Sequence, residues 1–184
     1  MDISVESGPR VWVGCLACYN AGRLRGKWIT AERMAEEIDA ERVTFLGLGE
    51  PSDRGTLCVV CGGDEWDVMD SEDVPRVCDG LRGFMDHASD LVQMDDGTLE
   101  RVHVLAVALG GDMSLDDLLA YDQDNYQGQW DRFRDFAEHY AEEVGDVDAM
   151  PEHLRDYLDY DAYARTLEYD YFHDDATGHI WRSV

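Results

Sequence analysis

The chain has 184 residues, with 41 acidic residues against 15 lysines and arginines and a formal net charge of −26. Apolar residues make up 45% of it and include five tryptophans and nine tyrosines, which excludes a disordered acidic tail. The longest apolar run, Val104 to Leu109, is too short to span a bilayer, and no basic-then-apolar leader precedes Val11. We therefore expect a folded cytoplasmic protein with no membrane contact, whose five cysteines are thiols or metal ligands.

The negative charge is concentrated in the second part of the chain. Residues 61–184 contain 32 acids and 8 arginines, whereas residues 1–60 contain 9 acids and 7 bases. A salt-adapted proteome or a GC-rich genome would give similar totals, but either bias should affect both parts alike. Because like charges repel and oppose compaction, the acidic block indicates a surface displayed to a positively charged partner. Such a surface attracts DNA-binding proteins and repels nucleic acid itself.

Residues 1–62 predict a small α+β domain. Its expected elements are a strand over 11–18, a strand over 26–30, a helix over 31–40 capped by Thr30, a loop over 47–55 and a short β segment over 57–61. Residues 63–119 predict a helical middle domain. Its expected helices cover 74–85, 99–109 behind a Thr98 cap, and 115–121 behind a Ser114 cap.

Residues 120–184 predict a second α+β domain. Its expected elements are a helix over 130–144, a further helix after Pro151, and a terminal β-hairpin with strands over 169–172 and 179–184. The whole chain therefore predicts an α+β fold of three small domains.

Two C-x-x-C pairs stand 39 residues apart, Cys15-Leu16-Ala17-Cys18 and Cys58-Val59-Val60-Cys61. Each pair follows a β segment and precedes a turn that contains glycine. Two such segments brought together form a tetrahedral four-cysteine zinc site, which is structural because four thiolates leave no open position. The alternative is four small buried hydrophobic side chains, since free cysteine is often buried. Cys78 is left over and is expected in a helix core.

The helix predicted over 130–144 has two unlike faces. One face carries the apolar side chains of Trp130, Phe133, Ala137, Tyr140 and Val144. The opposite face carries the carboxylates of Asp131, Asp135, Glu138 and Glu142. Carboxylates on neighbouring turns destabilise an isolated helix by a few tenths of a kcal/mol per pair, so burial of the aromatic face must outweigh this. The alternative is an ordinary solvated helix face. However, no Lys or Arg at i+4 is placed to pair with these acids, and Arg134, three residues after Asp131, compensates their charge only in part.

No catalytic motif is found in the sequence. Gly47 to Ser52 begins like a dinucleotide-binding fingerprint but has serine where the third glycine belongs, and the six histidines form no pair with ligand spacing. A zinc-dependent hydrolase would need an open metal position, which four cysteine ligands do not leave. The sequence therefore predicts a protein that is not an enzyme.

Two strings of residues resemble the antirestriction protein ArdA family. The first is Phe136-Ala137-Glu138-His139-Tyr140-Ala141-Glu142-Glu143-Val144-Gly145, followed by Pro151-x-x-Leu154-x-x-Tyr157-Leu158-Asp159-Tyr160. The second is Val11-Trp12-Val13, followed by Tyr19-Asn20-x-Gly22-x-Leu24-x-Gly26-x-Trp28. The resemblance covers roughly residues 10–32 and 120–184.

This resemblance implies a DNA mimic carried by phages or mobile elements and active in the host bacterial cell. Family members are elongated homodimers of three small domains that occupy the DNA groove of type I restriction–modification enzymes, with no cofactor or turnover. The stretch from Phe136 to Gly145 corresponds to their antirestriction motif, near the dimer contact. The cysteine pairs are not part of the family pattern, so a zinc ion would be an added brace for the first domain.

We expect competitive inhibition, in which carboxylates take the place of DNA phosphates on the Lys/Arg groove of the enzyme. The predicted phosphate surrogates are Asp116, Asp117, Asp131, Asp135, Glu138, Glu142, Glu152, Asp156 and Asp159. The alternative function is an acidic binding module that blocks another DNA-binding host protein or defence factor.

Overall fold

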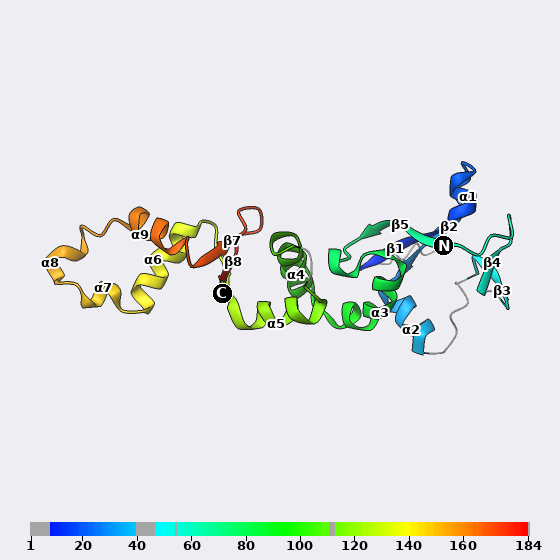
Figure 1. Ribbon diagram of the computed structural model, residues 1–184. Helices are drawn as coiled ribbons and strands as arrows, with labels where there is room; N and C mark the ends of the chain where they lie inside the picture. Colours follow the sequence, from blue (N-terminus) through cyan, green and yellow to red (C-terminus); the bar gives the residue numbers. More distant parts are fainter. Residues whose placement is uncertain (1–7, 40–46, 54, 111–112, 184) are drawn as a thin grey trace, which may run out of the picture. The chain divides into compact units, whose positions relative to one another are not determined.

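The computed structural model describes residues 8–39, 47–53, 55–110 and 113–183 (Figure 1). The chain divides into two compact units, Met1–Leu115 and Asp116–Val184. Each unit combines helices with antiparallel strands, which confirms the predicted α+β class. The division into three domains at residues 62 and 119 stays a prediction. Within the described ranges, no helix has both the length and the apolar character that a membrane span requires.

The first unit is built on a three-stranded antiparallel sheet. Its central strand β1 (Arg10–Cys15) lies between β2 (Gly26–Thr30) and β5 (Trp66–Glu72). Val11 and Val13 are fully buried at alternate positions of β1, which is the period of a strand. The predicted strand over 11–18 ends earlier, because the chain turns into the short helix α1 (Leu16–Asn20). The sequence did not predict β5, whose acidic residues interrupt any apolar alternation.

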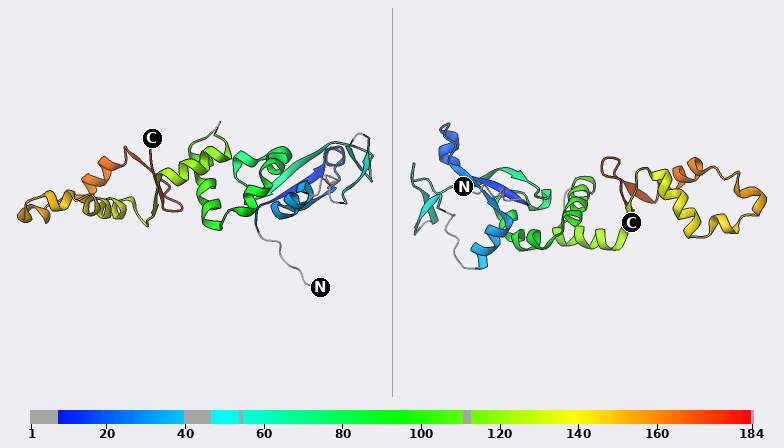
Figure 2. Two further views of the ribbon diagram at one scale, coloured as in Figure 1. Left: turned by 90° about the horizontal axis from the view of Figure 1, so that it is seen from below. Right: turned by 180° about the vertical axis from the view of Figure 1, so that it is seen from behind.

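The helix α2 (Ala31–Asp39) begins directly after β2, as predicted. The backbone amide of Arg33 donates to Thr30 Oγ1 at 3.2 Å, which confirms the Thr30 cap. The helix packs against α3 (Gly80–Gln93), which follows the 3-10 turn η1 (Arg76–Cys78) (Figure 2). The single helix predicted over 74–85 is wrong, because Asp79 is extended and separates η1 from α3. Cys78 is fully buried, but it lies in the 3-10 turn.

A two-stranded hairpin, β3 (Gly49–Ser52) and β4 (Gly55–Cys58), takes the place of the loop predicted over 47–55. Glycine, proline and serine disfavour central strands, but they are tolerated in an edge pair of this kind. The β segment predicted over 57–61 ends at Cys58, because the Gly62 amide donates to the Cys58 carbonyl at 2.7 Å and closes a turn.

Two further helices, α4 (Asp96–Ala108) and α5 (Leu115–Asn125), cover the regions where helices were predicted. The predicted Thr98 cap of α4 is wrong. The N-cap is Asp95, whose Oδ1 accepts from the Thr98 amide at 2.9 Å. This hydrogen bond lowers the pKa of Asp95. In α4, Val102 and Leu105 are buried one turn apart, and in α5 Leu115 and Leu118 are buried in the same way.

The second unit, in its described residues, combines one antiparallel sheet with most of α5 and four further helices. The strands, in sheet order, are β6 (Tyr126–Gln129), β8 (His179–Arg182) and β7 (Tyr171–His173). The helices are α6 (Phe133–Glu143), α7 (Asp146–Ala149), α8 (Glu152–Arg155) and α9 (Tyr160–Leu167). The predicted terminal hairpin is confirmed as β7 and β8. The helix predicted after Pro151 is a single turn, and the strand β6 was not predicted.

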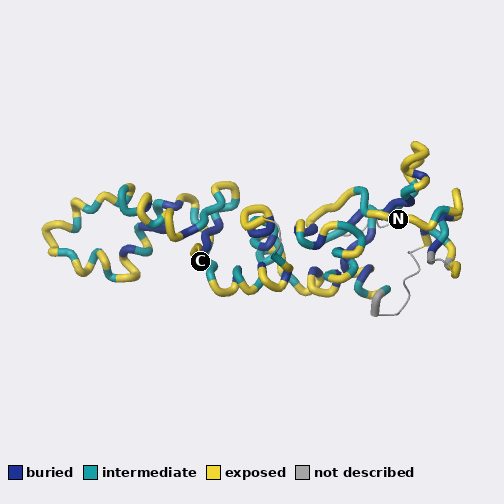
Figure 3. The backbone as a smooth tube through the Cα atoms, in the orientation of Figure 1, coloured by how far each residue is buried: buried dark blue, intermediate teal, exposed yellow. Residues whose placement is uncertain are grey.

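An aromatic core holds the second unit together, and the buried positions of this unit are dark blue in Figure 3. Its buried members are Phe133, Phe136, Ala137, Ala164, Tyr171 and Ile180. The ring centroid of Phe136 lies 5.1 Å from that of Tyr171 and 5.5 Å from that of Phe133, within the range of favourable aromatic pairs. The apolar face predicted for this helix is confirmed at Phe133 and Ala137, but the prediction did not include Phe136, which is also buried. The helix is shorter than the predicted range 130–144, because it begins at Phe133, and Val144 after its end is exposed.

A buried polar contact joins α5 to the sheet of this unit. Trp181 Nε1 donates to Asp122 Oδ1 at 2.8 Å, and both residues are buried. A buried polar group that is hydrogen-bonded avoids the cost of desolvation without a partner. The contact therefore fixes α5, and the carboxylates on it, to the C-terminal strand.

Candidate functional site: an acidic surface and a four-cysteine cluster

All nine predicted phosphate surrogates lie in the second unit. Two stand in the first turn of α5, and the others lie just before α6, on α6, on and just after α8, and at the N-cap of α9. Seven of them are exposed: Asp116, Asp117, Asp131, Glu142, Glu152, Asp156 and Asp159. Asp135 and Glu138 are half-buried. The folded chain thus brings most of the predicted carboxylates to the surface of one compact unit.

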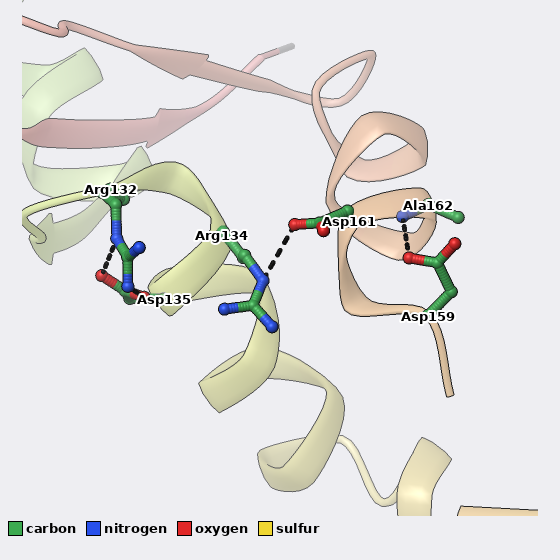
Figure 4. A network of polar contacts seen from close by, with 6 residues as sticks. All are labelled: Arg132, Arg134, Asp135, Asp159, Asp161 and Ala162. Atoms are coloured by element: carbon green, nitrogen blue, oxygen red, sulfur yellow. Dashed lines mark hydrogen bonds and ion pairs between the residues drawn. The ribbon is translucent and has the colours of Figure 1, made fainter. Parts of the chain in front are cut away.

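Asp135 differs from the others because it is held in an ion pair. The Arg132 guanidinium donates to its two carboxylate oxygens at 2.7 and 3.0 Å (Figure 4). These hydrogen bonds lower the pKa of Asp135, and they raise the pKa of Arg132 in turn. The side chain of Asp135 is only 32% exposed. A paired carboxylate presents less field to a partner than a free one, so Asp135 is a weak phosphate surrogate.

Arg134 was expected to compensate part of the charge of Asp131, and this expectation is wrong. Its Nε lies 2.9 Å from Asp161 Oδ1 on α9, so the arginine links α6 to α9 (Figure 4). Asp159 also has a structural role, because its Oδ1 accepts from the Ala162 amide at 3.0 Å and caps α9. The sequence could not indicate either contact, because α9 was not predicted.

Several of the nine carboxylates make no ion pair with any of the described residues, among them Asp131, Glu138, Glu142, Glu152 and Asp156. Glu138 and Glu142 stand four residues apart on α6, so they share one face with their Cβ atoms about 5–6 Å apart. Among these five, Asp131 adds to the raised pKa of Arg132, of which the hydrogen bond to Asp135 is the main cause. The negative charge of this group is therefore left for an outside partner.

The sequence reasoning did not single out Glu168 and Asp170, which are exposed directly after α9. Both add negative charge to the second unit. The predicted elements left 160–168 unassigned, so no helix pattern pointed to these residues. Their acidic character alone could have indicated them.

The four cysteines of the C-x-x-C pairs come together in the first unit, as the sequence predicted. Their sulfur atoms all lie within 4.8 Å of one another. The Cys15 and Cys61 sulfurs are 3.5 Å apart, and the Cys18 and Cys58 sulfurs are 3.8 Å apart. Cys61 is exposed and the other three are buried, with Trp66 packed against them. This arrangement could hold a metal ion.

Backbone hydrogen bonds shape the second cysteine pair into a tight turn. The Gly63 amide points at Cys61 Sγ at 3.4 Å, and the Cys58 amide donates to the Gly63 carbonyl at 2.8 Å. Burial acts to raise the pKa of Cys58, but hydrogen bonds from the Val60 and Cys61 backbone outweigh it, and the pKa falls to about 7. The turn therefore supports a thiolate at Cys58.

The model of the ArdA family, described as antirestriction protein, matches residues 11–180 of the chain. A comparison with curated proteins gives no match. The matched range takes in residues 33–119, for which the sequence had suggested no resemblance. Members of this family are DNA mimics that inhibit type I restriction–modification enzymes, and they do so without catalysing a reaction. Because the match spans nearly the whole sequence, the chain belongs to the ArdA family of antirestriction proteins.

Proposed function

We propose that this chain inhibits a type I restriction–modification enzyme by placing the carboxylates of its second unit in the DNA-binding groove of that enzyme. The observation that carries this proposal is a group of predicted surrogates that make no ion pair with the described residues, among them Asp131, Glu138, Glu142, Glu152 and Asp156. A folded protein that leaves so much like charge unpaired bears a cost in stability. A basic partner offsets that cost when it binds.

The physical basis of the mimicry is the charge pattern of DNA. Duplex DNA carries one negative charge per about 1.7 Å of helix axis, and proteins that bind it gain affinity largely by contacting phosphates with Lys and Arg. Carboxylates on helices can meet the same basic side chains. They offer no phosphodiester bond to cleave and no base to methylate, so the bound enzyme does neither reaction.

The nine surrogates do not contribute equally in this proposal. The largest contributions come from Asp131, Glu138, Glu142, Glu152 and Asp156, together with Asp116 and Asp117 at the start of α5. Asp135 and Asp159 contribute less, because Arg132 and the α9 backbone already engage them.

Three further features belong to the same proposal. The chain acts as a homodimer in the cytoplasm of the host bacterium, with the stretch from Phe136 to Gly145 near the dimer contact. The exposed apolar side chain of Val144, within that stretch, supports this assignment. The cofactor is one structural zinc ion on Cys15, Cys18, Cys58 and Cys61, which takes no part in inhibition.

The proposal is tested by competition with DNA. A purified type I enzyme complex is loaded with a fluorescent duplex that carries its recognition site, and the chain is titrated in. We expect displacement of the duplex, with a midpoint that rises in proportion to the duplex concentration. Displacement from an unrelated DNA-binding protein, with none from the type I enzyme, would favour a different target. A ternary complex of enzyme, duplex and chain would contradict groove occupation.

A further inference from the structure

We propose that the bound zinc ion is the core of the cysteine-bearing end of the first unit, so that the β3–β4 hairpin and α1 keep their folded positions only while the metal is present. This inference rests on the zinc proposal above. It adds that the metal has a local structural function, which can be tested apart from metal binding itself.

The four sulfurs lie within 4.8 Å of one another, and two of their separations match those of a zinc site. A tetrahedral site with Zn–S bonds of about 2.3 Å places each pair of sulfurs about 3.8 Å apart. The measured separations are 3.5 Å for Cys15 and Cys61 and 3.8 Å for Cys18 and Cys58. A disulfide would need about 2.05 Å, far below either value. Four sulfur ligands select zinc over magnesium or calcium, which prefer oxygen.

Apart from the cysteines, the hairpin β3–β4 buries few side chains, namely Leu48 just before β3 and Thr56 in β4. An isolated two-stranded hairpin is at best marginally stable in water. The side chains of Val59 and Val60, in the turn after β4, are more than half exposed, so they supply no core. The buried cluster at this point consists of Cys15, Cys18 and Cys58, with Trp66 beside it. The sulfurs therefore occupy the place that a hydrophobic core would normally fill.

The helix α1 depends on the same cluster. It has five residues and no side-chain cap, and its only buried residue is Cys18. A helix of this length is unstable by itself, because the free energy lost in ordering the first turn exceeds the free energy gained from its hydrogen bonds. Tyr19 and Leu24, which follow Cys18, are both exposed. Removing the metal from Cys18 thus removes the one anchor that buries a side chain of α1.

The remaining parts of the chain have cores of their own. The β2–β1–β5 sheet buries Val11, Val13 and Ile29, and the second unit has its aromatic cluster. Loss of zinc should therefore loosen α1 and the hairpin only. Direct hydrogen bonds such as Trp66 Nε1 to the Thr56 carbonyl, at 2.8 Å, should weaken with them.

The experiment combines metal analysis with hydrogen exchange on the full chain. The purified protein should contain one zinc per chain. Zinc is then removed by a strong chelator under reducing conditions, and amide exchange is compared before removal, after removal and after zinc is restored. We expect amides of α1, β3, β4 and the turn over 59–63 to lose at least tenfold in protection and to recover it with zinc. Amides of β2 and of the second unit should not change.

Two variants sharpen the test. Cys61→Ser removes the most exposed ligand and should behave like the zinc-free chain. Val60→Ser, in the same turn, is the matched control and should keep both zinc and protection.

A chain without zinc would contradict the zinc proposal. A chain that binds zinc yet keeps its hairpin protection after removal would overturn this inference alone. The displacement of duplex DNA from the enzyme tests the second unit, so its result is independent of the zinc and exchange measurements.

Discussion

The triple variant Glu138→Gln, Glu142→Gln, Asp156→Asn is expected to bind a type I restriction–modification enzyme on the order of a hundredfold more weakly than the original chain. Each of these carboxylates lacks an ion pair among the described residues, so each is available to a Lys or Arg of the groove. A single contact of this kind contributes about 1 kcal/mol, and about 1.4 kcal/mol corresponds to a factor of ten in Kd. The measurement is the Kd for the purified enzyme complex, at low and constant salt.

A second triple variant gives the matched control for this result. Glu32→Gln, Glu50→Gln and Asp53→Asn remove the same charge from exposed positions in the first 60 residues. If the acidic surface of the second unit binds the groove, this control should change Kd less than threefold. An equal loss in both variants would mean that net charge alone determines binding. The test variant should remain folded, because removing the Glu138–Glu142 repulsion slightly favours α6.

Replacing Phe136 by alanine should abolish inhibition without changing the charge of the chain. Phe136 is buried, and its ring contacts those of Phe133, Tyr140, Tyr171 and Trp130. Truncating a buried phenylalanine costs about 3–5 kcal/mol, which is a large part of the stability of a small unit. The free energy of unfolding is measured by denaturant titration, and inhibition is measured in parallel.

The control for this variant is Tyr169→Ala, which removes an aromatic side chain that is 87% exposed. It should change the unfolding free energy by less than about 0.5 kcal/mol and leave inhibition intact. If Phe136→Ala inhibited normally under conditions where the second unit is unfolded, a fixed surface would not be needed. The mimicry would then come from an unstructured polyanion, and the folded positions of the carboxylates would not matter.

Local patterns in the sequence predicted the elements that depend on neighbouring residues. Strand β2, the Thr30 cap of α2 and the terminal β7–β8 hairpin follow from short-range alternation, capping and turn chemistry. The strands β5 and β6 could not be predicted in this way. Both are stabilised by pairing with strands distant in sequence, and neither shows the apolar alternation on which strand prediction depends.

In the candidate sites too, local spacing predicted the contacts within one segment but not those that depend on the packing of distant segments. The C-x-x-C spacing was enough to predict that four sulfurs meet, because each pair is a local feature and zinc sites recur with this pattern. The Arg132–Asp135 ion pair, three residues apart on one turn, could have been expected from spacing alone. The Arg134–Asp161 pair could not, because it depends on the packing of α6 against α9.

The salt dependence of binding tests electrostatic mimicry most directly. The Kd of the chain and that of a recognition-site duplex are measured for one type I enzyme complex from about 50 to about 200 mM salt. We expect log Kd to rise linearly with log salt concentration for both ligands, with the affinity of the chain falling by at least about a hundredfold. A Kd of the chain that stays constant over this range, while that of the duplex rises, would contradict imitation of the DNA phosphates.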